Sequence, residues 1–476
     1  MSEYQYNKVT PEMIEKFKEI APKRVLVGDE INEDFTHDEM AIYGKARPEV
    51  LVEATSTEEV AAVVKLCNEN KVPVTPSGAR TGLVGGAVSI GGGVMISLTK
   101  MNKILGYDKE NFVVKIQSGV LLNDLAQDAE KQGLLYPPDP GEKFATVGGN
   151  VATNAGGMRA VKYGCTRDYV RAMTVVLPTG EIVKLGATVS KTSSGYSLLN
   201  LMIGSEGTLG IITELTLKVI PAPKSVISLI IPYEKFRGLY CKQYHQFFMH
   251  HLAPQALEFM EKEVVMDTEK FLGKQVYPKE LEGTEIGAYL LATFDGNSEE
   301  QLEDIIEQAS EVVLEAGAID VLVADTPALK KDAWAVRGAL LEAIEADTVL
   351  LDECDVVVPT NKIAEFLTYT KSLEAEADFR VKSFGHAGDG NLHIYTCSND
   401  MEEGEFKKQV AVFMDKVYAK ATEFGGMISG EHGIGHGKMD YLAESLGPVQ
   451  MRIMEGVKEV FDPNMILNPG KICYKL

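Results

Sequence analysis

Three glycine-rich segments constrain the fold of this chain more than any other feature. They are residues 76–93 (PSGARTGLVGGAVSIGGG), 136–157 (YPPDPGEKFATVGGNVATNAGG) and 201–219 (LMIGSEGTLGIITELTLKV), and each adjoins residues with strand-like patterns. Glycine accepts positive φ and lets backbone N–H groups approach a ligand without a Cβ in the way. Loops of this kind bind anions through oriented amides. Together they predict one large ligand with a diphosphate; the alternative is that the glycines only form turns and bulges of a sheet.

Two common nucleotide-binding motifs do not occur in the sequence. It contains no G-x-x-x-x-G-K-[ST] motif, and no G-x-G-x-x-G opens a helix after the first expected strand. We therefore expect the ligand to bind in neither a P-loop fold nor a Rossmann fold.

Glycine becomes sparse after residues 220–225 (IPAPKS), where two prolines indicate a domain boundary. Locally, the pattern of residues 47–78 predicts strand, helix and strand with Thr57 as the helix N-cap. Residues 172–185 predict a hairpin with a Pro-Thr-Gly turn, and residues 234–248 predict a helix. We expect four regions: a helical extension at 1–44, a glycine-rich domain at 45–222, an α+β domain at 223–428 and a C-terminal segment at 429–476.

Length and composition limit the classes of function. A chain of 476 residues is long enough for two or three domains. Its net charge of −22 opposes binding to nucleic acids and to anionic lipid. The six cysteines form no C-x-x-C pair, which argues against a disulfide framework and an iron–sulfur cluster. The N-terminal residues show no apolar signal region, and the longest aliphatic run, near 226–231, is too short for a membrane span, so we expect a cytoplasmic protein.

Half of the eight histidines lie in two polar, glycine-rich segments, GHAGDGNLH (385–393) and SGEHGIGHGK (429–438). Six residues that include a Gly-Asp-Gly-Asn turn separate His386 from His393, so the turn can bring both rings toward one point. Histidine and carboxylate are the usual ligands of a catalytic metal ion. The third ligand would come from Glu431, His432 or His436; the alternative is two polar turns whose histidines have other partners. The spacing does not fit an EF-hand.

The order of the motifs resembles a known flavoprotein family. PSGARTGLVGGA, ATVGGNVATNAGG, YGCTRDYV and IGSEGTLGIITELTLKV together resemble the FAD-binding domain of vanillyl-alcohol oxidase-type (p-cresol methylhydroxylase-type) proteins. GHAGDGNLH, SGEHGIGHGK and DPNMILNPGK resemble the C-terminal domain of FAD-linked oxidases. Within that group the chain resembles the D-2-hydroxyacid dehydrogenases over residues 45–476. The implied fold class is α+β, an FAD-binding domain plus a substrate (cap) domain with an antiparallel sheet, whose active site the C-terminal segment completes before returning to the FAD-binding domain.

The resemblance implies a site for FAD in the glycine-rich segments. No histidine occurs between His37 and His245, so a covalent link to histidine within that span is excluded and we expect non-covalent FAD. The residues that the resemblance assigns to FAD binding are Pro76, Ser77, Gly78, Ala79, Arg80, Thr81, Gly82, Pro138, Asp139, Thr146, Gly148, Gly149, Asn150, Thr153, Ala155, Gly156, Glu206, Gly207, Gly210, Ile211, Ile212 and Asn468.

The resemblance also implies the catalytic residues. His386, His393 and Glu431 would bind one divalent metal ion, and His432 would be the catalytic base. Zinc is favoured, with iron(II) and manganese as alternatives. A 2-hydroxy acid can chelate the ion, which lowers the pKa of the hydroxyl. The base then takes the proton while the C2 hydrogen leaves as hydride to the flavin. Arg337, in AWAVRG, would bind the substrate carboxylate; the alternative is a surface arginine on a helix.

Oxidation of D-lactate to pyruvate is the favoured reaction. Relatives that act on 2-hydroxyglutarate carry a lysine shortly before an Asp-Val segment, where this chain has Glu353 or Cys354 (LDECDVVVP). An acidic residue there would repel a distal carboxylate. The expected electron acceptor is an electron transfer flavoprotein. The alternatives are another 2-hydroxy acid such as glycolate, an iron–sulfur subunit or a quinone as acceptor, a non-catalytic flavoprotein subunit, and a metal-free relative that oxidises phenols or alcohols.

Overall fold

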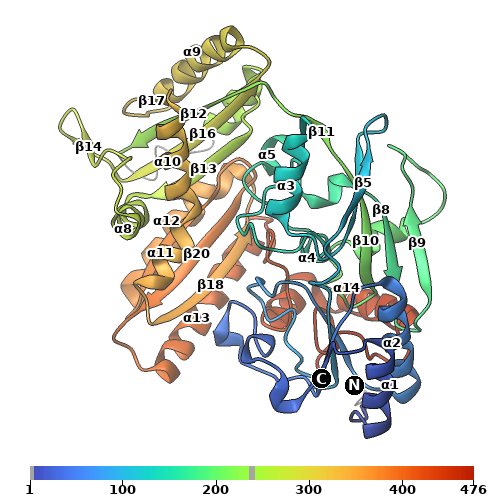
Figure 1. Ribbon diagram of the computed structural model, residues 1–476. Helices are drawn as coiled ribbons and strands as arrows, with labels where there is room; N and C mark the ends of the chain where they lie inside the picture. Colours follow the sequence, from blue (N-terminus) through green and yellow to red (C-terminus); the bar gives the residue numbers. More distant parts are fainter. Residues whose placement is uncertain (1–4, 235–241) are drawn as a thin grey trace. The chain divides into compact units, whose positions relative to one another are not determined.

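A computed structural model describes residues 5–234 and 242–476 (Figure 1). The chain forms two compact units. The first takes in the described residues up to Ala155, then Cys165–Ala222 and Glu431–Leu476; the second takes in Gly156–Gly164 and the described residues of Pro223–Gly430. The sequence assigned residues 156–164 to the glycine-rich domain, whereas the structure groups them with the second unit. The functions of the four predicted regions stay predictions.

A four-stranded sheet forms one part of the first unit. The strand, helix and strand predicted within residues 47–78 are confirmed as β2 (Val50–Glu53), α2 (Thr57–Asn70) and β3 (Val74–Ser77). Together with β1 (Val25–Val27) and β4 (Val94–Ser97), the strand order is β1-β2-β4-β3. β4 runs parallel to β2 and β3, and β1 runs antiparallel to β2. The N-terminal region therefore contributes a strand as well as the helix α1 (Pro11–Ile20).

The predicted N-cap of α2 is wrong by one residue. Ser56 is the N-cap, and its side chain accepts a hydrogen bond from the N–H of Glu59 at 3.2 Å. Thr57 is the first helical residue, and its hydroxyl instead donates to Thr213 Oγ1 at 2.9 Å. The preference of both residue types for caps explains the error.

A second sheet of the first unit has five antiparallel strands and adjoins the glycine-rich segments in sequence. Its order is β5 (Ile104–Asp108), β6 (Val113–Gln117), β10 (Ile211–Lys218), β8 (Val170–Val176) and β9 (Ile182–Gly186). The predicted hairpin is confirmed, since β8 pairs with β9 and the N–H of Gly180 donates to the carbonyl of Leu177 at 2.8 Å. Two short strands, β7 (Leu134–Leu135) and β11 (Ile220–Pro221), pair with each other. The remaining helices are α3 (Leu122–Lys131), α4 (Val147–Thr153), α6 (Leu198–Met202) and α14 (Met439–Phe461).

The second unit contains a seven-stranded antiparallel sheet, as predicted for the cap domain. Its order is β17 (Leu322–Ala324), β12 (Ser225–Tyr233), β16 (Ala288–Gly296), β13 (Ala256–Glu261), β19 (Arg380–His386), β20 (Asn391–Ser398) and β18 (Leu350–Val357). All of its strand pairs are antiparallel. The turn between β19 and β20, residues 387–390, lies within the segment GHAGDGNLH.

The helices of this unit pack against the sheet. They are α5 (Ala160–Tyr163), α7 (Lys242–Met249), α8 (Lys262–Leu272), α9 (Glu299–Glu315), α10 (Pro327–Gly338), α11 (Leu340–Ala346), α12 (Ile363–Leu373) and α13 (Glu403–Glu423). One hydrophobic core joins α8, α10 and α11 to the strands, with Met260, Leu291, Phe384 and Tyr395 buried in it. Of the helix predicted at 234–248, residues 235–241 lie outside the described residues, residue 234 follows β12 as a bend, and residues 242–248 fall in α7. No helix in the described part of the chain combines the length and apolar composition needed to cross a membrane.

Candidate active site

Five ionisable side chains share one face of the seven-stranded sheet. In the strand register, Glu258 lies opposite His386 and Asp355 lies opposite His393. Because side chains alternate with a period of two, this face also carries Met260, Phe384 and Tyr395, the residues packed against α8, α10 and α11. The fifth side chain, Glu353, lies two residues before Asp355 on β18. The polar group therefore adjoins the hydrophobic core of the unit.

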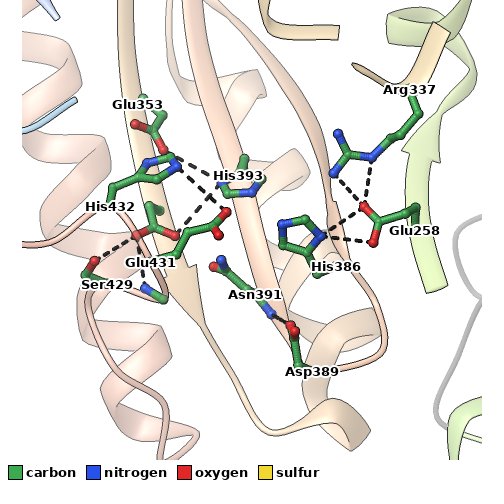
Figure 2. Close-up of polar contacts among 12 residues, drawn as sticks. Glu258, Arg337, Glu353, His386, Asp389, Asn391, His393, Ser429, Glu431 and His432 are labelled. Carbon is green, nitrogen blue, oxygen red and sulfur yellow. Dashed lines mark hydrogen bonds and ion pairs between the residues drawn. The ribbon is translucent and has the colours of Figure 1, made fainter. Parts of the chain in front are cut away.

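Glu258 connects His386 with Arg337 (Figure 2). Its carboxylate lies 2.9 and 3.0 Å from His386 Nδ1 and accepts a hydrogen bond from Arg337 Nε at 2.8 Å. Arg337 is 5% exposed, so it is not a surface arginine on α10. Burial raises the pKa of Glu258, but the neighbouring His386 and Arg337 outweigh burial, and the pKa lies below its usual value.

His393 lies beside two more buried carboxylates. Its Nδ1 is 3.8 Å from Glu353 Oε1 and 3.9 Å from Asp355 Oδ1. The other oxygen of Asp355 accepts hydrogen bonds from the hydroxyl of Ser429 at 2.7 Å and from the N–H of Gly430 at 3.0 Å. These bonds hold the last residues of the second unit against β18, and Glu431 follows directly in the chain.

Two groups of residues are suited to a metal ion in the described part of the chain. One is His386, His393 and Glu431, which is the predicted ligand set; the other is Glu353, His393 and His432. Within each group the ligand atoms lie within 4.8 Å of one another. Imidazoles together with carboxylates are a donor set that zinc, iron(II) and manganese accept, so the residues fit the implied ion. The roles of the three predicted ligands stay a prediction.

His432 and His436, the other candidate ligands, have different surroundings. His432 Nε2 lies 3.9 Å from Glu431 Oε1, and Figure 2 shows the two side chains near His393. His436 belongs to neither group found among the described residues. It packs beside Tyr43 with ring centroids 6.0 Å apart, and a Cβ on Gly85 would lie 2.4 Å from its ring. Burial, together with the charge of Lys471, lowers the pKa of His436 to about 4.

The three glycine-rich segments converge in the first unit. A Cβ on Gly78 would lie 2.3 Å from Thr146 Oγ1, and a Cβ on Gly207 would lie 2.5 Å from Pro76 Cγ. Gly207 also has a positive φ of 69°. Only glycine allows these approaches without displacement. The segments therefore form a single group of close-packed loops, as one large ligand requires.

A buried amide in these loops fits a polar ligand. Asn150, on α4, is 5% exposed, and its Nδ2 has no hydrogen-bond partner among the described residues. The same holds for Oδ1 of Asn468, which is 1% exposed. Buried polar groups are usually hydrogen-bonded, so these atoms can bind polar atoms of FAD.

Glu206 and Asn468 hold the C-terminal segment against the glycine-rich loops. The carboxylate of Glu206 accepts hydrogen bonds from the N–H groups of Ile434 at 2.7 Å and Gly435 at 2.8 Å. Asn468 Nδ2 donates to the carbonyl oxygens of Glu206 at 2.8 Å and Gly86 at 3.0 Å. Burial raises the pKa of Glu206, although the two N–H groups oppose the shift. Backbone groups of the chain itself thus bind the Glu206 carboxylate, a group that the family resemblance assigned to FAD binding.

The other residues assigned to FAD lie in or beside the same loops. Several of them have packing or backbone partners of their own. Gly210 is required because its Cβ would lie 2.4 Å from Val175 Cγ1, and Arg80 Nε donates to the carbonyl of Asp34 at 2.9 Å. Strand β3 ends with Pro76 and Ser77, and it is followed by Ala79, Thr81 and Gly82. Strand β7 is followed by Pro138 and Asp139, and β10 begins with Ile211 and Ile212. Helix α4 is capped by Thr146, contains Gly148, Gly149 and Thr153, and is followed by Ala155 and Gly156. Their contacts with FAD stay predictions.

Glu258 and Asp355 belong to the site, but no motif in the sequence indicates either of them. Glu258 lies 128 residues before His386, so no local motif connects them. A signal was present, because a glutamate inside the apolar strand ALEFME is unusual for a buried segment. Glu353 was noted as a determinant of substrate choice, but its position beside His393 was not foreseen.

Two family models match the chain. The family described as FAD linked oxidases, C-terminal domain, matches residues 222–472, which is more than half of the 476 residues. The family described as FAD binding domain matches residues 48–186. FAD as the cofactor is thereby confirmed.

Similar proteins and structures agree with these matches. The chain is 98% identical to a protein named D-lactate dehydrogenase from Anaerostipes hadrus, over 100% of both chains. It is 40% identical to a D-lactate dehydrogenase from Archaeoglobus fulgidus, over 90% of this chain and 92% of the relative. The crystal structure of p-cresol methylhydroxylase with substrate bound matches with a TM-score of 0.80 at 18% identity, over 98% of both chains. The predicted fold class is confirmed.

Replacement of Gly78 by alanine should weaken FAD binding about tenfold or more. The new methyl group would overlap Thr146 Oγ1, which accepts the N–H of Gly149 at the start of α4. Overpacking of this kind costs about 1–3 kcal/mol, and about 1.4 kcal/mol corresponds to a tenfold change in affinity. The ratio of flavin to protein absorbance after purification measures the effect. Gly141→Ala is the matched control, because no atom lies within 4 Å of its added Cβ; equal flavin content in both variants would contradict the close-approach argument.

Proposed function

This chain belongs to the FAD-linked oxidases, and from that membership we propose that it oxidises a short D-2-hydroxy acid, D-lactate, to pyruvate. Two observations carry the proposal together: the ligand atoms of His386, His393 and Glu431 lie within 4.8 Å of one another, and the buried Arg337 is connected to His386 through Glu258. The two relatives named D-lactate dehydrogenase support the same substrate.

Arg337 is suited to bind the substrate carboxylate. A guanidinium group carries N–H donors in a fixed fork, which matches the two oxygens of a carboxylate. Glu258 accepts one hydrogen bond from Nε and lies 2.6 Å from Nη2, which leaves other N–H groups of the guanidinium for a second carboxylate. The ring of Phe384, 5.0 Å from Arg337 Cζ, supports the guanidinium from one side.

His386, His393 and Glu431 would hold a divalent ion, with zinc favoured and iron(II) or manganese as alternatives. When bound, the ion lowers the pKa of a hydroxyl group that coordinates it. Nδ1 of His386 is directed to Glu258 and leaves Nε2 as the ligand atom.

His432 is proposed as the general base. It follows the ligand Glu431 directly in the chain, and its Nε2 lies 3.9 Å from Glu431 Oε1. An imidazole next to the ion would take the hydroxyl proton of the substrate. Bound FAD supplies the acceptor for the C2 hydrogen, which leaves as a hydride.

The buried Glu353 supports a substrate with a single carboxylate. It is 2% exposed and lies 3.8 Å from His393 Nδ1, so a second substrate carboxylate close to it would meet a like charge. This disfavours 2-hydroxyglutarate. It does not separate D-lactate from glycolate, which stays the alternative substrate.

A non-catalytic subunit and a phenol oxidase are less well supported. A subunit without activity has no need for two buried histidines and three buried carboxylates, whose desolvation opposes folding. The likeness to p-cresol methylhydroxylase, at 18% identity, shows the fold alone.

Anaerobic reduction of the bound flavin tests the substrate. D-lactate should bleach the flavin fastest, and L-lactate should react at least about tenfold more slowly, because with its hydroxyl and carboxylate bound at the same two points its C2 hydrogen is directed elsewhere. D-2-hydroxyglutarate should also react at least about tenfold more slowly, because Glu353 repels its second carboxylate, and p-cresol should not react, because it has no carboxylate for Arg337. Stopped-flow absorbance measures the rates.

Removal of the metal ion tests its role. The protein should lose the reaction with D-lactate after treatment with a chelator and should regain it with zinc, iron(II) or manganese. Full reaction in the chelated protein would exclude the role of the ion.

An electron transfer flavoprotein is the acceptor that we propose. Reduced FAD must pass its electrons on before a second substrate can react, and this acceptor is the one that the family resemblance favours over an iron–sulfur subunit or a quinone. D-lactate with catalytic amounts of the enzyme should reduce a purified electron transfer flavoprotein faster than it reduces a water-soluble quinone or O₂. Preferred reduction of the quinone or of O₂ would refute this part of the proposal. The cytoplasmic location stays a prediction.

His432→Ala should lower the rate of flavin reduction by D-lactate about 10²- to 10⁴-fold, the usual contribution of a general base. FAD content and metal content should stay at the wild-type level, because His432 is not one of the proposed ligands. Replacement of the exposed His250 is the control. A His432→Ala variant with unchanged rate would show that another group takes the proton.

A further inference from the structure

Glu258 is a buried carboxylate that contacts two residues of the candidate site. It lies on β13 between β16 and β19, directly opposite His386, and its side chain is fully buried. A carboxylate in such a place loses its hydration, which opposes folding unless other groups compensate. Here Arg337 and His386 compensate the carboxylate, one from each side of it.

The two partners of Glu258 come from different elements. From α10, Arg337 donates through Nε at 2.8 Å and approaches through Nη2 at 2.6 Å, both to Oε2. From the end of β19, His386 Nδ1 lies 3.0 Å from Oε1 and 2.9 Å from Oε2. Figure 2 shows Glu258 between the two side chains. One carboxylate thus fixes the guanidinium and the imidazole at the same time.

We propose that Glu258 is the positioning residue that links the metal ligand His386 to the substrate-binding Arg337. This inference rests on the proposed function. By accepting Nδ1–H, the carboxylate selects the tautomer of His386 whose Nε2 lone pair is available to the ion. By engaging the Nε edge of Arg337, it leaves the remaining Nη hydrogens for the substrate carboxylate.

The arrangement explains why the substrate is a hydroxy acid and not a simple alcohol. A 2-hydroxy acid offers a hydroxyl for the ion and a carboxylate for the guanidinium, one carbon apart. Both recognising groups contact the same buried side chain, so a displacement of one is transmitted to the other. The spacing between the two recognition points is therefore set inside the second unit, by three side chains from β13, β19 and α10.

The same strand provides a matched control. Glu261, three residues further along β13, is also buried at 4% exposure and accepts a hydrogen bond from the hydroxyl of Ser383 at 2.5 Å. It contacts neither Arg337 nor His386 in any interaction that the structure describes. Glu261→Gln therefore removes a buried carboxylate from β13 and leaves the proposed link intact.

The test is a cobalt(II) titration of metal-free wild-type, Glu258→Gln and Glu261→Gln proteins with FAD bound. Glutamine keeps the shape of Glu258 but presents an N–H₂ group to one of two donors, so the cobalt affinity of Glu258→Gln should fall about 10- to 100-fold, the usual effect of losing the partner of a metal-bound histidine. Glu261→Gln should bind cobalt like the wild type. Equal affinity in all three proteins would overturn the inference.

Kinetics separate the link from a general loss of structure. With saturating cobalt, Glu258→Gln should recover most of kcat for D-lactate, while KM stays raised because Arg337 remains misplaced. A proportional loss of kcat with unchanged KM would contradict the role toward Arg337. If wild type fails to oxidise D-lactate while Glu258→Gln still loses cobalt affinity, the proposed function fails and the role toward His386 stands.

A measurement on the wild type covers the case in which Glu258→Gln does not fold. ¹⁵N chemical shifts of labelled histidine in the metal-free protein report which ring nitrogen carries the proton, and the signal of His386 is assigned by its loss in His386→Gln. The inference requires Nδ1–H at His386. An Nε2–H tautomer would overturn it.

Discussion

The alternation of side chains along the antiparallel strands of the second unit is the constraint on which the candidate site depends. Met260, Phe384 and Tyr395 pack against α8, α10 and α11, and the same alternation places Glu258, His386 and His393 on that face. A slip of one residue in any of these strands would move its apolar and polar residues together to the other face. The packing energy of the core therefore also fixes the positions of Glu258 and of the two proposed histidine ligands.

Much of the fold could be predicted because its signals are local. The strand, helix and strand of residues 50–77 and the hairpin of β8 and β9 follow from short-range patterns and turn residues. The two histidines of GHAGDGNLH are brought together by a turn within the same segment, so spacing was informative. Gly390 shows why the turn needs glycine, since its φ is 87° and a Cβ would lie 2.0 Å from the carbonyl oxygen of Val358.

Contacts between distant segments could not be predicted in this way. Glu258 contacts His386 only because β13 pairs with β19. No local sequence motif predicts the order of strands in a seven-stranded sheet. Glu206 is a second residue whose contacts could not be predicted from the sequence around it. The family resemblance assigned Glu206 to the cofactor, whereas its carboxylate accepts hydrogen bonds from the N–H groups of Ile434 and Gly435, 228 and 229 residues away in sequence. A motif indicates which residues matter, but it does not indicate which atoms they contact.

These distant contacts also determine how the proposed base is held. Before it in the chain, Ser429 and Gly430 are bound by Asp355 within the second unit. After it, Ile434 and Gly435 are bound by Glu206 within the first. Only Glu431, His432 and Gly433 lie between the two anchors, and a connection of three residues has few accessible conformations. A buried carboxylate on each side thus restricts the backbone that carries a proposed metal ligand and a proposed base. Glu206 and Asp355 thus act on these two residues only through the conformation of the chain, and neither is proposed to touch the substrate.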